Sequence, residues 1–268
     1  MNRKIKLLVF DFDGTALGGH EPYARFPSEF AVFLDKLSRN GILWATNTTW
    51  APKEQYKLIK QSGVRSQPTL LTGQTGRLVA KVKSGKVVFD SGHGRMVKAV
   101  DLAFRKENRA LVNSVLEKFI AGDEIEQFSC NDFDQNIISY KAQKGKALQA
   151  WKLIRPLIAS GAFYLWEPDK KSSNSLLPYY MNKGAALKII QEKLHIAPEH
   201  TVVAGDATND LHMFDARLAK YMICPANAHY SIKRIVRKNH GIVSDKKFSW
   251  GVIDAMETLL DQIKETLC

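Results

Sequence analysis

The chain has 268 residues, which is long enough for one large domain or for a core domain with a smaller insertion. Apolar residues make up 45% and charged residues 25%, as in ordinary globular proteins, and no segment approaches the roughly 18 consecutive apolar residues of a membrane helix. Lysine and arginine outnumber aspartate and glutamate by 39 to 27, so the net charge of +12 favours anionic partners, from small phosphorylated metabolites to nucleic acid.

The three cysteines, Cys130, Cys224 and Cys268, are odd in number and far apart, which argues against a disulfide framework or a zinc site. The apolar run at the start of the chain stops at Asp11 without a signal-peptide cleavage site, so we expect a cytoplasmic protein. The basic residues are spread along the chain, and no nucleic-acid-binding motif is present. We therefore expect neither a membrane nor nucleic acid as a partner, and the oligomeric state is left open.

Short apolar runs alternate with helical patterns at both ends of the chain. This alternation predicts an α/β fold, a doubly wound and mainly parallel Rossmann-like sheet formed by residues 1–80 and 183–268. In chain order the predicted elements are strand 6–10, a helix from Pro27-Ser28 to Asn40, strand 42–46, a helix from Pro52 to Gly63, helix 184–194, strand 201–204, a helix after Asn209, strand 221–224, a helix through 232–235 and a last helix from Trp250.

The middle of the chain has a different pattern. Five strand-like segments, with two helical stretches among them, predict an α+β insertion over residues 81–182. These segments are 86–89, 125–128, 136–140, 162–166 and 175–177.

The first candidate for chemistry is the segment Asp11-Phe-Asp13-Gly-Thr15, directly after the first strand. Its two carboxylates are expected at the carboxyl edge of the sheet, where open α/β sheets bind ligands. There Asp11 can attack a phosphorus atom, while Asp13 protonates the leaving oxygen and then deprotonates a water. The alternatives are two solvated turn carboxylates or a calcium loop, although the later glutamate of a calcium loop is missing.

A second acidic loop, Gly205-Asp206-Ala-Thr-Asn209-Asp210, follows the predicted strand 201–204 and is expected at the same edge. Magnesium prefers hard oxygen ligands, so Asp11, the main-chain carbonyl of Asp13, and Asp206 or Asp210 form a candidate Mg²⁺ site. The alternative is a turn followed by a helix that Asn209 caps.

Phosphate ligands are predicted from two further positions. Thr46 ends the second strand, and its hydroxyl, with donors from Asn47 and Thr48, suits phosphate oxygens. Lys183 precedes a helix and can neutralise both phosphate and nucleophile. A threonine at a strand end and a solvated lysine are, taken singly, commonplace features.

Taken together and in order, four segments of the sequence resemble the four motifs of the haloacid-dehalogenase-like (HAD) phosphatases. They are D-F-D-G-T at Asp11, Thr46 at a strand end, Lys183 in N-K-G-A-A-L, and G-D-A-T-N-D at Gly205. The sequence is most similar to the Cof and sucrose-phosphatase-like branch, in which an α/β cap that selects the substrate is inserted between the second and third motifs. The predicted insertion lies at that place, and Leu176-Leu-Pro178 before Lys183-Gly184 is also typical of the branch.

This resemblance implies a set of roles for the residues of the four motifs. It implies that Asp11 is the nucleophile and Asp13 the general acid and base. Thr46 and Lys183 are implied as phosphate ligands, and Asp206 and Asp210 as carboxylates on the metal side. Asn209 is implied to contact the phosphate or to order its loop. The usual T-G-R after the second strand is Thr46-Asn47-Thr48 here, so the contact made by that arginine is missing.

Two loops of the insertion are further candidates for substrate contacts. They contain Asp132, Asp134 and Asn136, which could meet sugar hydroxyls, and Lys171, which could meet a second anionic group. A hairpin turn and a solvated charged loop are the alternatives.

The function predicted from the sequence is a Mg²⁺-dependent phosphatase for a small phosphorylated metabolite, expected to be a sugar phosphate, acting through an aspartyl-phosphate. A phosphomutase with the same nucleophile is the first alternative. A non-catalytic nucleic-acid-binding or partner-binding protein on the same fold is the second.

Overall fold

The computed structural model describes residues 5–20, 23, 25–131, 136–167 and 171–265 of the chain. The chain divides into two compact units, of which the first comprises Met1–Ser91 with Lys183–Cys268 and the second Gly92–Asn182. The first unit is therefore built from both ends of the chain, and the second is an insertion into it.

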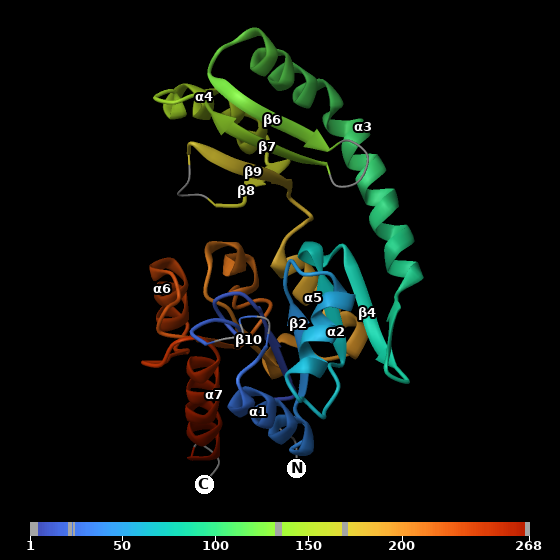
Figure 1. Cartoon of the computed structure of the whole chain (residues 1–268), viewed down its shortest axis with the longest axis vertical. Coiled ribbons are helices and arrows are strands. Elements are labelled where there is room, and N and C mark those ends of the chain that lie inside the picture. Colours follow the sequence, from blue (N-terminus) through green and yellow to red (C-terminus); the bar gives the residue numbers. More distant parts are fainter. Residues whose placement is uncertain (1–4, 21–22, 24, 132–135, 168–170, 266–268) are drawn as a thin grey trace. The chain divides into compact units, whose positions relative to one another are not determined.

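The first unit is organised around one sheet of eight strands within the described residues, in the order β12-β11-β10-β1-β2-β3-β4-β5 (Figure 1). The strands from β12 to β3 are parallel, and β4 and β5 are antiparallel to their neighbours. The bounds are β1 (Leu7–Phe10), β2 (Leu43–Asn47), β3 (Leu70–Gly73), β4 (Leu78–Lys83), β5 (Lys86–Phe89), β10 (Thr201–Ala204), β11 (Tyr221–Cys224) and β12 (Ile242–Val243). The predicted doubly wound α/β class is confirmed.

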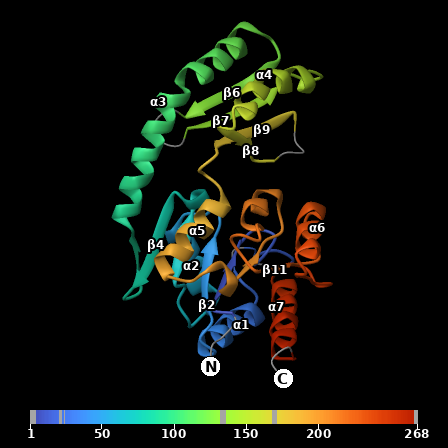
Figure 2. The same cartoon turned by 180° about the vertical axis from the view of Figure 1, so that it is seen from behind.

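Helices cover both faces of this sheet, so every residue of the central strands β1 and β10 is buried. Alternate side chains of β1 point to opposite faces, so Leu8 and Phe10 pack with α1, α2 and α7, whereas Leu7 and Val9 pack with α5 and α6 (Figures 1 and 2). These helices are α1 (Ser28–Arg39), α2 (Pro52–Gln61), α5 (Lys183–Leu194), α6 (Tyr230–Lys238) and α7 (Phe248–Glu265).

Local sequence sets the helix positions. In α1 the buried residues Phe30, Phe33, Leu34 and Leu37 recur at helical spacing and form one apolar stripe. Helix α2 begins at Pro52, where the missing proline N–H costs nothing because the first amides of a helix have no intrahelical acceptor.

The second unit has its own sheet of four described strands, in the order β6-β7-β9-β8, and its own apolar core. Phe104 of α3 and Ile154 of α4 pack on the buried face of this sheet together with Ile138 of β7. The elements are α3 (Ser91–Ala121), β6 (Ile125–Asn131), β7 (Ile137–Ala142), α4 (Ala147–Ala159), β8 (Phe163–Leu165) and β9 (Ser173–Pro178).

One boundary of the predicted insertion requires correction. The insertion was expected over 81–182, but the second unit begins at Gly92, and its end at Asn182 coincides with the prediction. Residues 81–91 were misplaced because β4 and β5 resemble the strands that follow them, whereas β4 in fact pairs with β3 and extends the first sheet.

The helix predicted after Asn209 is a short 3-10 helix, η3 (Thr208–Met213), instead. Its first turn is tightened because a carboxylate oxygen of Asp210 accepts hydrogen bonds from the amides of Asp206 and Ala207, at 2.8 and 3.0 Å. The polar residues that predicted the start of a helix therefore stabilise a short turn of the acidic loop.

None of the described helices is both long and apolar enough to cross a bilayer.

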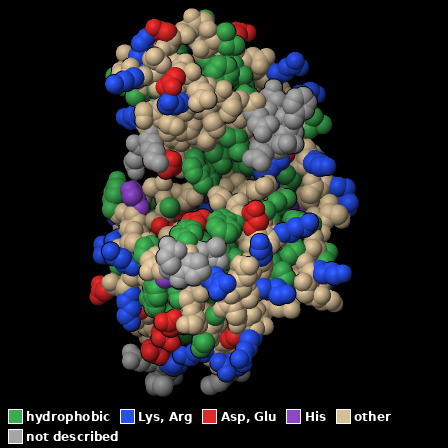
Figure 3. Space-filling view, in the orientation of Figure 1, with side chains coloured by type: hydrophobic (Ala, Val, Ile, Leu, Met, Phe, Trp, Pro, Cys, Tyr) green, Lys and Arg blue, Asp and Glu red, His purple; other side chains and the backbone are tan. Residues whose placement is uncertain are grey.

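Two short connecting 3-10 helices, η1 (Gln74–Gly76) and η2 (Pro198–His200), complete the described elements. On the face seen in Figure 3, lysine and arginine side chains are scattered among other residue types and form no continuous basic stripe.

Replacing Phe10 should reveal how much the aromatic core stabilises the first unit. Its ring is fully buried and contacts the rings of Phe12, Phe26, Phe30 and Trp44. We expect Phe10→Ala to lower the free energy of unfolding by about 3–5 kcal/mol through lost apolar contacts and a cavity, as measured by urea denaturation.

The matched control is Val32→Ala on α1, whose side chain is 61% exposed. This change should alter the free energy of unfolding by no more than about 0.5 kcal/mol. Equal effects of the two substitutions would contradict the central place of the Phe10 ring.

Candidate active site

The two acidic loops meet where β1 and β10 end side by side. Phe10 pairs with Ala204 in the sheet, and the amide of Asp11 donates to the Ala204 carbonyl at 3.1 Å. The chain order reverses between these two strands, which is the place where open α/β sheets bind ligands.

Gly14 permits the close approach of the two loops. Its φ is +77°, and a Cβ at this position would lie 2.1 Å from a carboxylate oxygen of Asp206. Beside it, the hydroxyl of Thr15 donates to Asp206 Oδ1 at 2.8 Å. The D-x-D-G-T segment thus holds Asp206 in place as well as supplying its own carboxylates.

The centre of the site is a buried ammonium group. Lys183 Nζ lies 2.8 Å from Asp11 Oδ2 and 2.5 Å from Asp210 Oδ1, and all three side chains are buried. Lys183 is the first residue of α5, so the start of this helix sets the position of the charge. The structure therefore joins three of the predicted residues in one ion-paired cluster.

Carboxylate oxygens of Asp11, Asp206 and Asp210 lie within 4.8 Å of one another, close enough to bind a single metal ion. Three hard oxygen donors match the ligand preference of Mg²⁺. The carboxylate of Asp13 is not a member of this group, so a metal role for that residue rests on its main-chain carbonyl.

Burial and mutual repulsion perturb these carboxyls. Burial, reinforced by the Asp210 charge and opposed by Lys183, raises the pKa of Asp11 to about 7. Burial, with the charges of Asp210 and Asp11, likewise raises the pKa of Asp206 to about 8. Burial alone would lower the pKa of Lys183, but its two carboxylate partners outweigh this effect and raise it. The cluster holds more negative charge than one ammonium neutralises.

Asp13 has a separate environment, although it lies only two residues after Asp11. Its Oδ1 accepts a hydrogen bond from the Tyr23 hydroxyl at 2.6 Å, and its Oδ2 accepts one from the Trp50 indole N–H at 2.8 Å. Burial, together with this hydrogen bond to Asp13, raises the pKa of Tyr23. Neither aromatic residue was predicted from the sequence, because nothing in their spacing marks them.

The structure gives Thr46 and Asn47 partners other than an open phosphate site. The single hydroxyl proton of Thr46 is donated to Gln55 Oε1 at 2.5 Å. The Asn47 amide donates to the Lys183 carbonyl at 2.8 Å and contacts Met213 Sδ at 3.8 Å. Because these donors are already engaged, Asn47 supports the start of α5, and Thr46 is tied to Gln55.

Asn209 differs from these residues. Its Oδ1 is buried and receives no hydrogen bond from any residue that the structure describes. Buried acceptors normally have a hydrogen-bond partner, so this oxygen of the acidic loop can still accept a hydrogen bond.

The predicted substrate residues of the insertion are only partly described. Asp132 and Asp134 lie outside the described residues. Asn136 is 93% buried (7% exposed), and Arg105 donates to its Oδ1 at 3.1 Å. Lys171 is exposed, with its ammonium 5.8 Å from the ring centre of Trp151.

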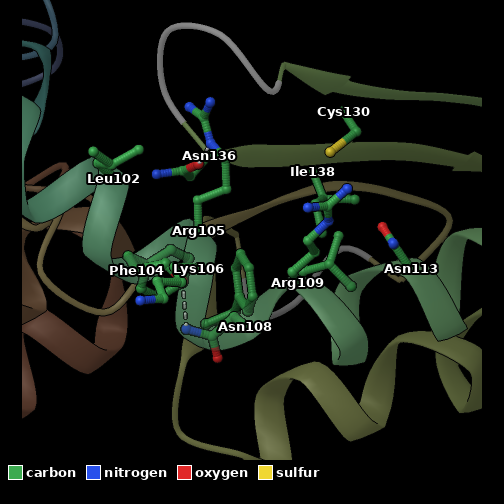
Figure 4. Close-up of a pocket in the computed structure, with 12 residues that line it drawn as sticks. Leu102, Phe104, Arg105, Lys106, Asn108, Arg109, Asn113, Cys130, Asn136 and Ile138 are labelled. Atoms are coloured by element: carbon green, nitrogen blue, oxygen red, sulfur yellow. Dashed lines mark hydrogen bonds between the residues drawn. The ribbon is translucent and has the colours of Figure 1, made fainter.

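Asn136 also lines a cavity of about 580 Å³ within the second unit, between α3 and β7 (Figure 4). Arg105 and Arg109 rise from one side of α3, and Ile138 and Cys130 belong to the facing strands. The structure thus places Asn136 in a basic, half-apolar cavity, while Lys171 is not among the residues that line it.

Comparisons with known proteins show the family of the chain. Residues 8–256 match the family model of the haloacid dehalogenase-like hydrolases. The chain is 26% identical over 261 residues to a protein named phosphoglycolate phosphatase from Staphylothermus marinus, covering 96% of this chain and 99% of the relative. A second phosphoglycolate phosphatase, from Thermoplasma volcanium, is 42% identical over 80 residues, which is 30% of this chain and 31% of that protein.

Solved structures show the same fold. The sucrose-phosphatase of Synechocystis, solved in complex with sucrose and phosphate, has a TM-score of 0.65 at 18% identity and covers 96% of this chain and 98% of its own. A haloacid dehalogenase-like hydrolase from Bacillus subtilis has a TM-score of 0.59 at 17% identity, covering 95% and 92%.

The chain belongs to the haloacid dehalogenase-like hydrolase family. Within that family it is a phosphoric monoester hydrolase that acts on a phosphorylated substrate. The resemblance recognised from the four sequence motifs is confirmed.

The raised carboxyl pKa values predict how stability depends on pH. A carboxyl with a higher pKa in the folded state than in the unfolded state stabilises the fold below its unfolded value, near 3.8, and this contribution is lost as pH rises through about 7 and 8. We therefore expect the Tm of the metal-free protein to fall by a few degrees between pH 5 and pH 8, measured by calorimetry.

The control for this measurement is Asp11→Asn, which keeps the shape of the side chain and removes one titrating group. The fall in Tm over the same interval should be smaller in this variant. An equal fall in both proteins would show that other groups cause the pH dependence.

Proposed function

We propose that the chain hydrolyses small phosphate monoesters in a Mg²⁺-dependent reaction through an aspartyl-phosphate on Asp11. The observation that carries the proposal is the buried Asp11 carboxylate with the Lys183 ammonium 2.8 Å away. A carboxylate can attack an anionic phosphate only where positive charge offsets their repulsion. Lys183 supplies this charge in a position fixed by a helix start.

In the proposed first step, an oxygen of Asp11 forms a bond to phosphorus as the bond to the leaving oxygen breaks. The leaving oxygen takes the electron pair of that bond and a proton from Asp13. In the second step, Asp13 accepts a proton from a water, whose oxygen attacks phosphorus and releases Asp11. The two aspartates suit different roles because one is ion-paired and buried and the other is bound by neutral donors.

The residues present fit a Mg²⁺ ion. Asp11, Asp206 and Asp210 would hold it together with the Asp13 carbonyl, and the raised pKa values of Asp11 and Asp206 mark a cluster short of positive charge. When bound, the ion would supply electrostatic neutralisation of the phosphate oxygens. Asn209, whose buried Oδ1 receives no hydrogen bond from the described residues, remains a candidate for contact with the phosphate or for ordering the acidic loop.

The phosphate-binding roles are proposed in a revised form. Lys183 remains the principal phosphate ligand. For Thr46 and Asn47, a donor role toward phosphate would require them to exchange the partners described above, so we assign Asn47 the positioning of Lys183.

We propose that the substrate is a small phosphorylated metabolite. The relative from Staphylothermus marinus, similar over nearly the whole chain, is named phosphoglycolate phosphatase, and a solved structure of the same fold is named sucrose-phosphatase. The sugar phosphate predicted from the sequence stays a prediction, and phosphoglycolate is the first compound to test beside it. Asn136 and Lys171 remain candidates for contacts from the insertion.

Asp11→Asn should reduce hydrolysis of p-nitrophenyl phosphate at least about a thousandfold, because an amide cannot serve as the nucleophile. The measurement is the rate of p-nitrophenol release with magnesium. The control is Asp261→Asn on α7, an exposed aspartate that pairs with Lys264, and it should retain full activity. Activity of Asp11→Asn equal to that of the unmodified enzyme would overturn the proposal.

A screen of phosphorylated metabolites with and without magnesium should identify the substrate class. We expect phosphate release from phosphoglycolate or from sugar phosphates, lost on chelation with EDTA and restored by Mg²⁺. A hexose 1-phosphate that gives the 6-phosphate instead of free phosphate would show a phosphomutase. Release that is unaffected by EDTA would contradict the assigned metal site.

A further inference from the structure

We propose that Trp50, together with Tyr23, is a positioning residue that holds the Asp13 carboxyl group in place for proton transfer to the leaving oxygen. This inference rests on the proposed function and deepens it. Its basis is the pair of hydrogen bonds that reach the two different oxygens of Asp13, from the indole at 2.8 Å and from the phenol at 2.6 Å.

These two donors fix the plane of the carboxyl group. Each oxygen has more than one lone pair, so both hydrogen bonds can persist while one oxygen carries the proton that is transferred. As the bond from phosphorus to the leaving oxygen breaks, that oxygen takes the bonding electrons and the Asp13 proton. Asp13 is then a carboxylate, and the indole N–H and phenol O–H stabilise the charge that remains on it.

Trp50 is itself held in place at both its ring and its backbone. Its ring packs edge-on against Phe12 with ring centres 5.9 Å apart. Its carbonyl accepts a hydrogen bond from Gln55 Nε2 at 2.7 Å, and a Cβ on Gly73 would lie 2.4 Å from the same oxygen. Because the backbone and ring are both fixed, the indole N–H is presented to Asp13 in a defined direction.

Gln55 extends this support to the second strand. It is fully buried and binds three partners through one side chain, namely the Thr46 hydroxyl, the Trp50 carbonyl and the Thr72 carbonyl at 2.5, 2.7 and 2.9 Å. The end of β2, the end of β3 and the start of α2 are thereby tied to the residue that orients Asp13.

The test compares two substrates of nearly equal size that differ in their need for a proton. Phenol is about as weak an acid as the tyrosine side chain, so phenyl phosphate needs a proton on its leaving oxygen, whereas p-nitrophenol leaves readily as the anion. The quantity measured is kcat/KM, which covers the steps up to departure of the leaving group and excludes the later attack of water.

We expect Trp50→Phe to lower the ratio of kcat/KM for phenyl phosphate to that for p-nitrophenyl phosphate about tenfold, because proton transfer from a positioned group contributes roughly 100-fold or more to a rate. Tyr23→Phe should lower the same ratio, and Asp13→Asn should lower it most. Trp250→Phe, a tryptophan of the same unit whose ring contacts His20, should leave the ratio unaltered.

A purely structural role for Trp50 would reduce kcat/KM for both substrates by one factor and leave their ratio constant, and that result, or a constant ratio with unaltered rates, would overturn the inference. Failure of the proposed function is recognised separately, since it would appear as an unmodified enzyme that releases no phosphate or as an active Asp11→Asn variant.

Discussion

The ion-paired ammonium of Lys183 is the interaction on which the site depends. Two buried aspartates, Asp11 and Asp210, face each other from different loops, and each would be costly to bury without a counter-charge. The ammonium satisfies both and fixes the distance between the loops. Its position is set by the start of α5, which Asn47 holds from the end of β2. Lys183, which follows the insertion in sequence, thus lies in the same site as Asp11, which follows the first strand.

Two aspartates two residues apart have different surroundings, which suits them to the different roles proposed for them. Asp11 lies in a buried, crowded acidic cluster beside a cation, and its pKa is raised to about 7. Asp13 is held by an indole and a phenol, which are neutral donors. This separation of environments is the general means by which enzymes give two carboxyl groups the distinct roles of nucleophile and acid.

Much of the fold followed from local patterns. The strands 201–204 and 221–224 match β10 and β11, since continuous apolar runs bounded by polar loops mark buried parallel strands. The start of the insertion was misplaced because an antiparallel edge strand such as β5 has the same local pattern as a strand of a second domain. The pairing of β5 with β4 assigns β5 to the first sheet, and such a contact between two segments cannot be seen in the local pattern of either one. The helix expected after Asn209 became a 3-10 turn because the Asp210 carboxylate binds the amides before it.

By itself, the sequence determined the family, the order of the four motifs and the set of residues Asp11, Asp206, Asp210 and Lys183. These depend on residue type and on position, after a predicted strand for the aspartates and before a predicted helix for the lysine. Only the tertiary structure decided which groups each side chain contacts. It tied the Thr46 hydroxyl to Gln55 and the Asn47 amide to the Lys183 carbonyl, and it brought Trp50 and Tyr23 to Asp13. Hydrogen bonds are directional and short, so such contacts depend on the approach of segments distant in sequence, which no local pattern records.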